Sequence, residues 1–398
     1  MKKLLVVVWA VSVSTFATEA PIEWPYPEDI PTASSAVPRP AGEVPYDIVR
    51  FLKTRGPRAA RISPDGKRLT FLSTVTGEPQ LFGMPTQGAA PQQMTFGRAV
   101  TFYEWSPDSH WLVYGADRDG NEREAYTLIG ADGRQERQLS ESGPAFLAFG
   151  SFTNSGARVA FASTLRNGKD FDVYVRSVEG GDAQLIHEGS FGFYARAWHP
   201  DDMRLLIAET RGEDGNNLYL LDSTTGALDT LFKPEVGSRY VSATWLKDGS
   251  GFYLATDQDR NFVGLGFYEL ETRELTMLET PERDVANVTL FYNQRYLAWT
   301  VNEDGYDRLH VFDRQEQGAV EVPELPAGVY SLSGAHQTAL LSVHVTGPRT
   351  PGEIWLWDLA AQRTRLAVPA TLAGIDPATL VDPESESFAA RDGVKLQG

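Results

Sequence analysis

The chain has 398 residues, of which 42% are hydrophobic and 22% are charged, values that suit a packed globular protein and exclude a disordered one. Its formal net charge of −17 disfavours nucleic acid as a partner, because a phosphate backbone would be repelled. The sequence contains no cysteine, so the hydrophobic core must hold the fold without disulfides.

Residues 1–20 have the pattern of a secretory signal peptide. Two lysines begin it, residues 4–13 form an apolar stretch, and small residues follow. Cleavage is expected after Ala17 or Ala20. The apolar run is short for a bilayer span, and an uncleaved N-terminal anchor is the alternative. We therefore expect a periplasmic or secreted protein with no further membrane segment.

Residues 21–53 are predicted to form a proline-rich arm followed by a short helix. Prolines recur from Pro21 to Pro45 and exclude regular sheet or helix there. The arm is expected to run extended along a surface and to be mobile in the isolated chain. The short helical candidate covers Tyr46 to Lys53.

A strand end that runs into a polar turn recurs along the chain and marks the start of each repeat. Turns of the Pro-Asp-Gly type join neighbouring strands because Asp and Gly accept the backbone angles that hairpins need. A short apolar strand follows each turn. The landmark lies at residues 62–66, 105–108, 152–156, 198–201, 245–249, 291–293 and, more weakly, 332–334.

An apolar residue followed by a ring forms a second landmark, and successive rings lie 42 to 49 residues apart. The rings are Phe82, Tyr126, Tyr174, Tyr219, Tyr268, His310 and Trp355. A period in the forties with about four short strands per unit indicates propeller blades. We therefore predict an all-β, seven-bladed β-propeller of four-stranded antiparallel blades over residues 54–368. In the fourth unit, the first strand is expected to end at Trp198. The next three strands are expected to cover residues 204–210, 217–222 and 227–232.

Residues 369–398 are predicted to form a linker followed by the first strand of a new domain, from Ser387 to Leu396. The loops between the second and third strands are acidic in five units, at residues 117–122, 166–170, 213–216, 257–261 and 302–307. A single such loop resembles a calcium site, but five at one blade position indicate turn chemistry. Because strands alternate in direction, these loops should lie on the face where the chain leaves the last blade.

Catalytic motifs are missing from the sequence. The string nearest to a nucleophile elbow, Lys247 to Gly251, has Asp in place of the first Gly and falls in a blade hairpin. The metalloprotease, phosphate-loop and dinucleotide motifs are also absent. His310 shares the ring position of Tyr219 and Tyr268, so packing is expected, and His199 falls in a strand-one turn. We assign no catalytic, cofactor-binding or metal-binding residue and no cofactor.

A resemblance to a known family is carried by four short strings. They are the turns Ser63 to Lys67 and Trp105 to Asp108, the loop 117–122, and Ser387-Phe388 followed by Asp392-Gly393 and Leu396. Over residues 45–398 the chain resembles the prolyl oligopeptidase family of serine peptidases, closest to its acylaminoacyl- and dipeptidyl-peptidase-like branch.

The resemblance implies a two-part peptidase. An α/β-hydrolase domain, expected C-terminal to Gly398, would carry Ser, Asp and His, and the propeller would admit only short or unfolded peptides. The chain ends before the nucleophile, so no catalytic residue carries over and the chain should be inactive alone. Glu122 and Glu124 are spaced one apart and do not match the paired-glutamate motif of the dipeptidyl branch. The acidic loops would rim the opening between the two domains and bias which peptides enter.

Two alternatives stay open. One is a periplasmic TolB-like propeller that acts as a protein-binding scaffold. The other is a propeller enzyme such as a lyase or glycosidase, which the lack of clustered histidines or of a carboxylate pair at defined spacing disfavours.

Overall fold

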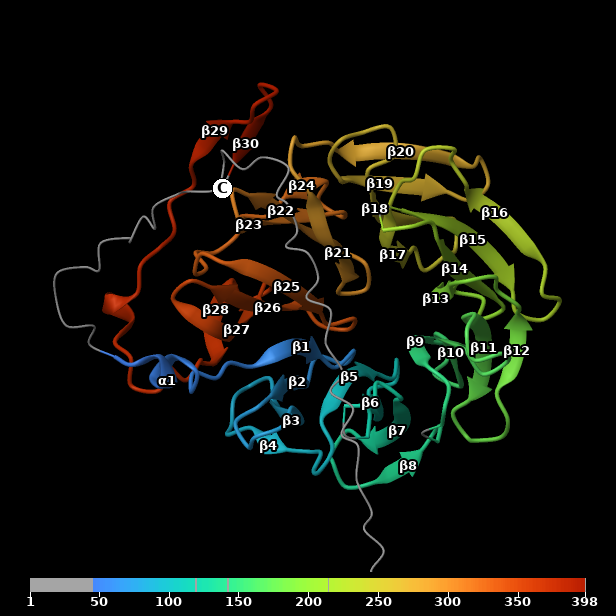
Figure 1. Ribbon diagram of the computed structural model, residues 1–398, viewed down its shortest axis with the longest axis horizontal. Coiled ribbons are helices and arrows are strands. Elements are labelled where there is room, and N and C mark those ends of the chain that lie inside the picture. Colours follow the sequence, from blue (N-terminus) through green and yellow to red (C-terminus); the bar gives the residue numbers. More distant parts are fainter. Residues whose placement is uncertain (1–45, 119, 142, 214, 398) are drawn as a thin grey trace, which may run out of the picture. The chain divides into compact units, whose positions relative to one another are not determined.

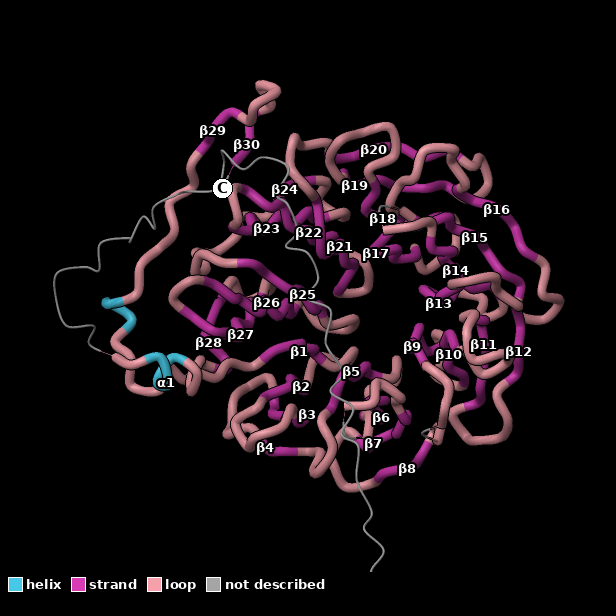
Figure 2. The backbone as a smooth tube through the Cα atoms, in the orientation of Figure 1, coloured by secondary structure: helices cyan, strands magenta, loops and turns pink. Residues whose placement is uncertain are grey.

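Each repeat folds into a four-stranded antiparallel sheet, and the seven sheets follow one another around a ring (Figure 1). The computed structural model describes residues 46–118, 120–141, 143–213 and 215–397. Consecutive strands are neighbours within every sheet, with the first strand of each sheet nearest the centre of the ring. Nearly all regular structure is strand (Figure 2). The predicted seven-bladed, all-β propeller is confirmed.

Four blades occupy the first part of the ring. Their strands are β1 (Arg58–Ile62), β2 (Arg68–Ser73), β3 (Gln80–Pro85) and β4 (Gln92–Gln93); β5 (Val100–Trp105), β6 (Trp111–Ala116), β7 (Ala125–Gly130) and β8 (Glu136–Gln138); β9 (Leu147–Phe152), β10 (Arg158–Ser163), β11 (Asp172–Ser177) and β12 (Gln184–His187); and β13 (Phe193–Trp198), β14 (Arg204–Thr210), β15 (Asn216–Asp222) and β16 (Leu228–Phe232). The strands predicted for the fourth blade match these bounds to within one residue.

Three further blades complete the ring. Their strands are β17 (Tyr240–Trp245), β18 (Gly251–Thr256), β19 (Gly264–Glu269) and β20 (Glu274–Glu279); β21 (Val285–Phe291), β22 (Tyr296–Glu303), β23 (Tyr306–Asp313) and β24 (Gly318–Ala319); and β25 (Val329–Gly334), β26 (Leu340–Gly347), β27 (Thr350–Asp358) and β28 (Arg363–Val368).

Short elements flank the propeller. The predicted helix is a single turn, α1 (Ile48–Phe51), and a 3-10 turn, η2 (Pro377–Thr379), lies in the linker. The C-terminal strand prediction was incomplete: β29 (Ser387–Ala389) and β30 (Lys395–Gln397) pair as a hairpin. The predicted signal peptide and proline-rich arm, residues 1–45, lie outside the described residues. Among the helices that are described, none has the length and apolar character of a membrane span.

The hydrophobic core is divided among the seven interfaces between neighbouring blades. Seven buried clusters occur in the described residues, and each draws its members from two adjacent blades. The cluster between blades four and five, for example, joins Leu206 and Leu220 to Phe252 and Leu254. Every blade therefore buries both of its faces, which explains why the strands read as near-continuous apolar runs.

The ring landmark falls in the third strand of every blade, but its alignment was wrong in two of them. Tyr219 and His310 both pair with the fourth residue of strand two, as expected for one shared position. Tyr268 pairs with the second residue, Phe252, so the equivalent position in blade five holds a glycine. Tyr126 is displaced by one residue and therefore packs toward blade three rather than blade one. Because side chains alternate across a strand, a shift of one residue reverses the face.

Blade one shows why the Ser-Pro-Asp-Gly turns form. The Ser63 hydroxyl donates to the Asp65 carboxylate at 2.6 Å, and the Lys67 amide donates to the same oxygen at 3.0 Å. Gly66 has a φ of 77°, a left-handed conformation that glycine adopts without steric cost. Burial by itself would raise the pKa of Asp65, but these hydrogen bonds hold it below its usual value. The turn is therefore specified by its own side chains.

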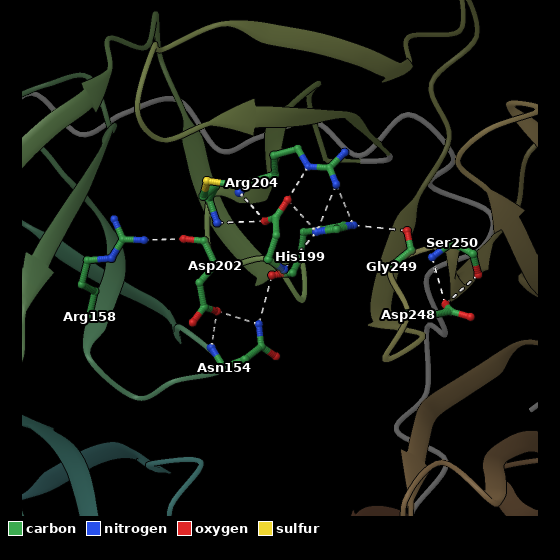
Figure 3. A network of polar contacts seen from close by, with 10 residues as sticks. Asn154, Arg158, His199, Asp202, Arg204, Asp248, Gly249 and Ser250 are labelled. Carbon is green, nitrogen blue, oxygen red and sulfur yellow. Dashed lines mark hydrogen bonds and ion pairs between the residues drawn. The ribbon is translucent and has the colours of Figure 1, made fainter.

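Hydrogen bonds also join the strand 1–2 turns of successive blades into a belt. We call the face that carries these turns, with the strand 3–4 turns, the turn face. Ser109 of blade two accepts from the Asp65 amide at 3.0 Å, and Gln294 of blade six accepts from the Lys247 amide at 2.9 Å. Asp202 of blade four accepts from the Asn154 amide of blade three at 2.6 Å (Figure 3).

Asp202 provides a test of this belt. Its carboxylate also accepts from the Asn154 side chain at 2.8 Å and from the Ser155 amide at 2.9 Å. Burial opposes ionisation of Asp202, but these donors outweigh it and lower the pKa. We expect Asp202→Ala to lower the free energy of unfolding by about 1 kcal/mol, because three donors lose their acceptor. Asp202→Asn should cost less, since asparagine keeps one acceptor oxygen and tolerates the residue's φ of 58°.

The pH dependence of the Asp202 effect follows from the sign of the shift. A carboxyl whose pKa is lower in the folded state stabilises the fold above its unfolded pKa. That stability is lost as the pH falls through the folded value. Urea unfolding of the wild type and Asp202→Asn should therefore differ at neutral pH and converge in acid. A difference that is constant with pH would contradict the assigned role.

The ring closes without a strand shared between its two ends. Blade seven takes all four strands from the C-terminal part of the propeller, and blade one takes all four from the N-terminal part. The seam between them is held by the amides of His336 and Gln337, which both donate to the Pro64 carbonyl at 2.9 Å. A bridge between Arg55 and Thr371 lies beside the seam. Side chains and single hydrogen bonds, rather than a continuous ladder, therefore close this propeller.

Candidate functional site

One face of the propeller combines several features of a binding surface. It carries the strand 2–3 loops and the connections between blades, and we call it the loop face. The chain enters and leaves the ring there, as the Arg55–Thr371 bridge shows. The Arg349 guanidinium in the strand 2–3 loop of blade seven forms an ion pair of 2.7 Å with Asp382 of the outgoing linker. The alternating strands place the acidic loops on the face where the chain leaves the last blade, as predicted.

The acidic loops hold themselves and their neighbours together. The Asp257 carboxylate accepts from the amide and side chain of Arg239 at 2.7 and 2.9 Å. Asp304 pairs with Arg283 at 3.0 Å, and the Asp307 carboxylate accepts from the Tyr330 amide at 2.8 Å. These three carboxylates bond to inter-blade connections and to blade seven. The predicted turn chemistry is seen in the loop of blade two, where the Asp117 carboxylate accepts from the Glu122 amide at 3.0 Å. In the described part of the chain, no three His, Cys, Asp or Glu residues are grouped as a metal site would require.

Exposed apolar side chains gather on the loop face. Six large apolar residues in its loops are between 36% and 81% exposed. In the turn-face loops of the described residues, Met203 is the single large apolar residue that is exposed. The six are Val75, Phe96, Leu165, Phe191, Val236 and Phe262. They come from the loops and connections of blades one to five. The six come from separate loops, and their shared face is the candidate surface for contacts with a partner. None of the six was predicted from the sequence as a site residue.

Glu124 lies at the end of the acidic loop of blade two, near the first strand of that blade. Its carboxylate accepts from the Thr101 hydroxyl at 2.5 Å. Burial raises the pKa of Glu124, and the nearby Asp117 carboxylate acts in the same direction, while the Thr101 bond opposes both. Next to it, the Arg123 guanidinium lies 3.1 Å from the centre of the Phe146 ring. Glu124 is thus a carboxylate held in a partly desolvated position on the loop face.

The centre of the ring differs in character from the loop face where it reaches the turn face. A cavity of about 480 Å³ opens on the turn face and is lined by first strands and turns of blades one, two, six and seven. Arg61 and Glu104 line it as an ion pair of 3.5 Å. Trp105 forms part of its wall, and its ring nitrogen donates to the Thr70 hydroxyl at 2.9 Å. The lining of this cavity is therefore mixed in charge and fixed by internal contacts.

Serine, histidine and aspartate side chains come close together where blades four and five meet, but not as a catalytic triad (Figure 3). The buried His199 ring is 3.0 Å from Asp201 and 3.2 Å from the Gly249 carbonyl oxygen. The Ser250 hydroxyl instead donates to Asp248 at 2.8 Å. As predicted, the string 247–251 is the turn between β17 and β18. His199 serves blade-to-blade packing, since a base must contact the nucleophile that it activates.

His310 also occupies a packing position. Its half-buried ring stacks on Trp299 at a centroid distance of 5.3 Å and an interplanar angle of 8°. Burial lowers the pKa of His310, so the stacked ring is favoured in its neutral form. The packing role predicted from the ring position is confirmed.

Comparison with known proteins agrees with this architecture. A search of curated proteins gave no match. Among solved structures, a prolyl endopeptidase matches with a TM-score of 0.70 and 14% identity, over 87% of this chain and 54% of its own. A mutant of prolyl oligopeptidase B from Galerina marginata, bound to a 25mer macrocyclization substrate, matches with a TM-score of 0.72 and 13% identity, over 87% and 55%. The chain thus spans about half the length of these enzymes.

The family profile described as "Prolyl oligopeptidase, N-terminal beta-propeller domain" matches residues 91–369. That match covers six of the seven blades and the end of the first, from β4 to the end of β28. This chain therefore belongs to the prolyl oligopeptidase N-terminal β-propeller family.

Proposed function

We propose that this chain is the substrate-gating propeller of an exported serine peptidase that hydrolyses short peptides. In this proposal an α/β-hydrolase domain, encoded beyond Gly398, supplies the catalytic serine, aspartate and histidine and docks on the loop face. The observation that carries the proposal is the gathering of exposed apolar side chains on the face where the chain leaves the ring. Export is proposed from the signal-peptide pattern of residues 1–20.

The docked domain would be covered by the propeller, so that substrates reach the catalytic serine only through restricted openings. A ring with seven packed interfaces suits this role, because close-packed side chains between blades resist separation of the blades. Two carboxylates of the acidic loops, Asp257 and Asp304, form ion pairs with arginines. We therefore propose that size, more than charge, determines which peptides enter. Cationic peptides would gain only a modest preference.

The catalytic part of the proposal is tested by comparing two proteins. One is the chain of 398 residues, and the other carries in addition the segment that the gene encodes downstream of codon 398. A short chromogenic peptide should be hydrolysed only by the longer protein, and a serine-directed fluorophosphonate should stop the reaction. Turnover by the 398-residue chain would overturn the proposal. A stop at codon 398 with no downstream hydrolase would favour the TolB-like scaffold instead.

A further inference from the structure

A cavity of about 850 Å³ lies between blades five and six. Leu265 and Leu278 of blade five and Trp299 and Phe312 of blade six form its apolar walls. We call the part of its lining formed by the strand 1–2 and strand 3–4 turns of blade six its mouth. From there the lining extends to Leu265 and Glu279, at the loop-face ends of β19 and β20. Its size falls within the range of small-molecule sites in proteins.

The short fourth strand of blade six leaves this cavity open. β24 has two residues, and it pairs only with Phe312 and Asp313 of β23. Beyond β24, one further backbone bond joins Val320 to Val311 at 2.8 Å, whereas β20 pairs with β19 of blade five along its length. Leu278 of β20 is 46% exposed. The perimeter between the two blades is therefore not covered by a complete outer strand.

Arg314 presents a positioned cation at the mouth of the cavity. Its Nε donates to the Tyr253 hydroxyl at 3.2 Å and its Nη1 donates to the Gln294 carbonyl at 2.6 Å. Its guanidinium also lies 5.6 Å from the centre of the Tyr253 ring. Arg295, which lines the same cavity, is paired with Asp313 at 2.6 Å. Arg314 has no carboxylate within 4.0 Å among the described residues, and Asp248 is the carboxylate that interacts with its charge from a greater distance. An anion in the cavity could therefore form the direct ion pair with Arg314.

The backbone at the mouth is strained. Tyr292, Asn293 and Gln294 have φ values of 51°, 53° and 65°, three successive left-handed residues with no glycine among them. The Gln294 side chain fixes this turn by donating to the Trp245 carbonyl at 2.8 Å and accepting from the Lys247 amide. Such strain persists only where the surroundings impose it, and it is typical of ligand clamps. The turn is thereby held in place before a ligand arrives.

We propose that this cavity binds a small monocarboxylate that carries one apolar or aromatic group, the chemistry of a peptide's carboxyl end. The carboxylate would pair with Arg314, and the apolar group would lie between Leu278 and Trp299. Glu279 lines the cavity from blade five and selects against a second negative charge on the ligand. This site is independent of the proposed gating role, since it is contained in the 398-residue chain.

Titration calorimetry on the 398-residue chain tests the site with N-acetylphenylalanine as the probe. Its amide should bind about tenfold more weakly or worse, because the charge-assisted hydrogen bond to Arg314 is lost. N-acetylglycine, which lacks the apolar group, should also bind at least about tenfold more weakly. The comparison with 3-phenylpropionate identifies the source: tighter binding of the acetylated amino acid indicates a peptide end, and tighter binding of the simple acid indicates a small aromatic acid.

Two variants separate the site from general effects on the fold. Arg314→Met should lose about tenfold in affinity, while Arg134→Met on the surface of blade two should bind as the wild type does. If Arg314→Met lowers the melting temperature, Leu278→Trp is the second variant, because it fills the cavity from an exposed position and should abolish binding in a folded chain. Equal binding of the acid and its amide, undetectable binding of every probe, or unchanged affinity in both variants would overturn the proposal.

Discussion

If the proposed hydrolase domain docks on the loop face, replacing Phe96 and Phe191 together by aspartate is expected to release it without unfolding the propeller. The two rings are 75% and 69% exposed in this chain, so the substitutions remove little buried area from the fold. Burying a phenylalanine side chain contributes about 2 kcal/mol, and two such residues at one interface correspond to a loss of about 10²-fold or more in association. Aspartate adds the cost of burying two charges.

The release is measured in the protein that carries the downstream segment. Limited proteolysis within residues 369–386 should become rapid in the double variant, and hydrolysis of longer peptides should rise relative to that of short ones. Met203→Asp is the matched control, because Met203 is 54% exposed on the turn face and should change neither result. Unchanged proteolysis and unchanged length selectivity in the double variant would show that these rings do not hold the hydrolase domain.

Gly56→Val is expected to produce the largest loss of stability at the ring seam. A Cβ atom at Gly56 would lie 2.6 Å from the Pro351 carbonyl oxygen and 2.8 Å from the Gly352 Cα. These are backbone atoms of blade seven and cannot move aside as a flexible side chain would. Because the seam has no shared strand, the added volume should separate blade one from blade seven. We expect a loss of about 1–3 kcal/mol in the free energy of unfolding, the usual cost of overpacking.

The control for the seam variant is Gly237→Val. A Cβ atom at Gly237 would meet no other atom within 4 Å, and the residue lies in a connection on the loop face. Chemical unfolding followed by tryptophan fluorescence should show a clearly lower midpoint for Gly56→Val. The midpoint of Gly237→Val should be nearly that of the wild type. Equal midpoints for Gly56→Val and the wild type would mean that blades one and seven are not packed as described.

The blade architecture could be predicted from sequence because local chemistry determines it. The Ser63 and Asp65 side chains specify their turn by contacts within five residues, and the same pattern recurs at Ser106 and Asp108. Such turns fix where strands begin, and the repeat then fixes the number of blades. The ring alignment failed at Tyr126 and Tyr268, because a dipeptide pattern does not contain the pairing register.

The candidate surface could not be predicted in the same way, because exposure depends on neighbouring blades. Phe96, Phe191 and Val236 read like ordinary apolar residues, and only the folded ring shows that no element among the described residues covers them. A weak signal was present: each precedes a glycine in a loop between repeats, outside the alternating pattern of a strand. The cavity at Arg314 depends on a fourth strand that is only two residues long, which propensity does not reveal.

Hydrogen–deuterium exchange that compares the 398-residue chain with the protein carrying the downstream segment tests the docking face most directly. Loop-face segments around Phe96, Phe191 and Val236 should exchange more slowly in the longer protein, because a docked domain shields them. Turn-face segments around Ser109 and Met203 should exchange equally in both. Protection that appears on the turn face, or on neither face, would contradict the account.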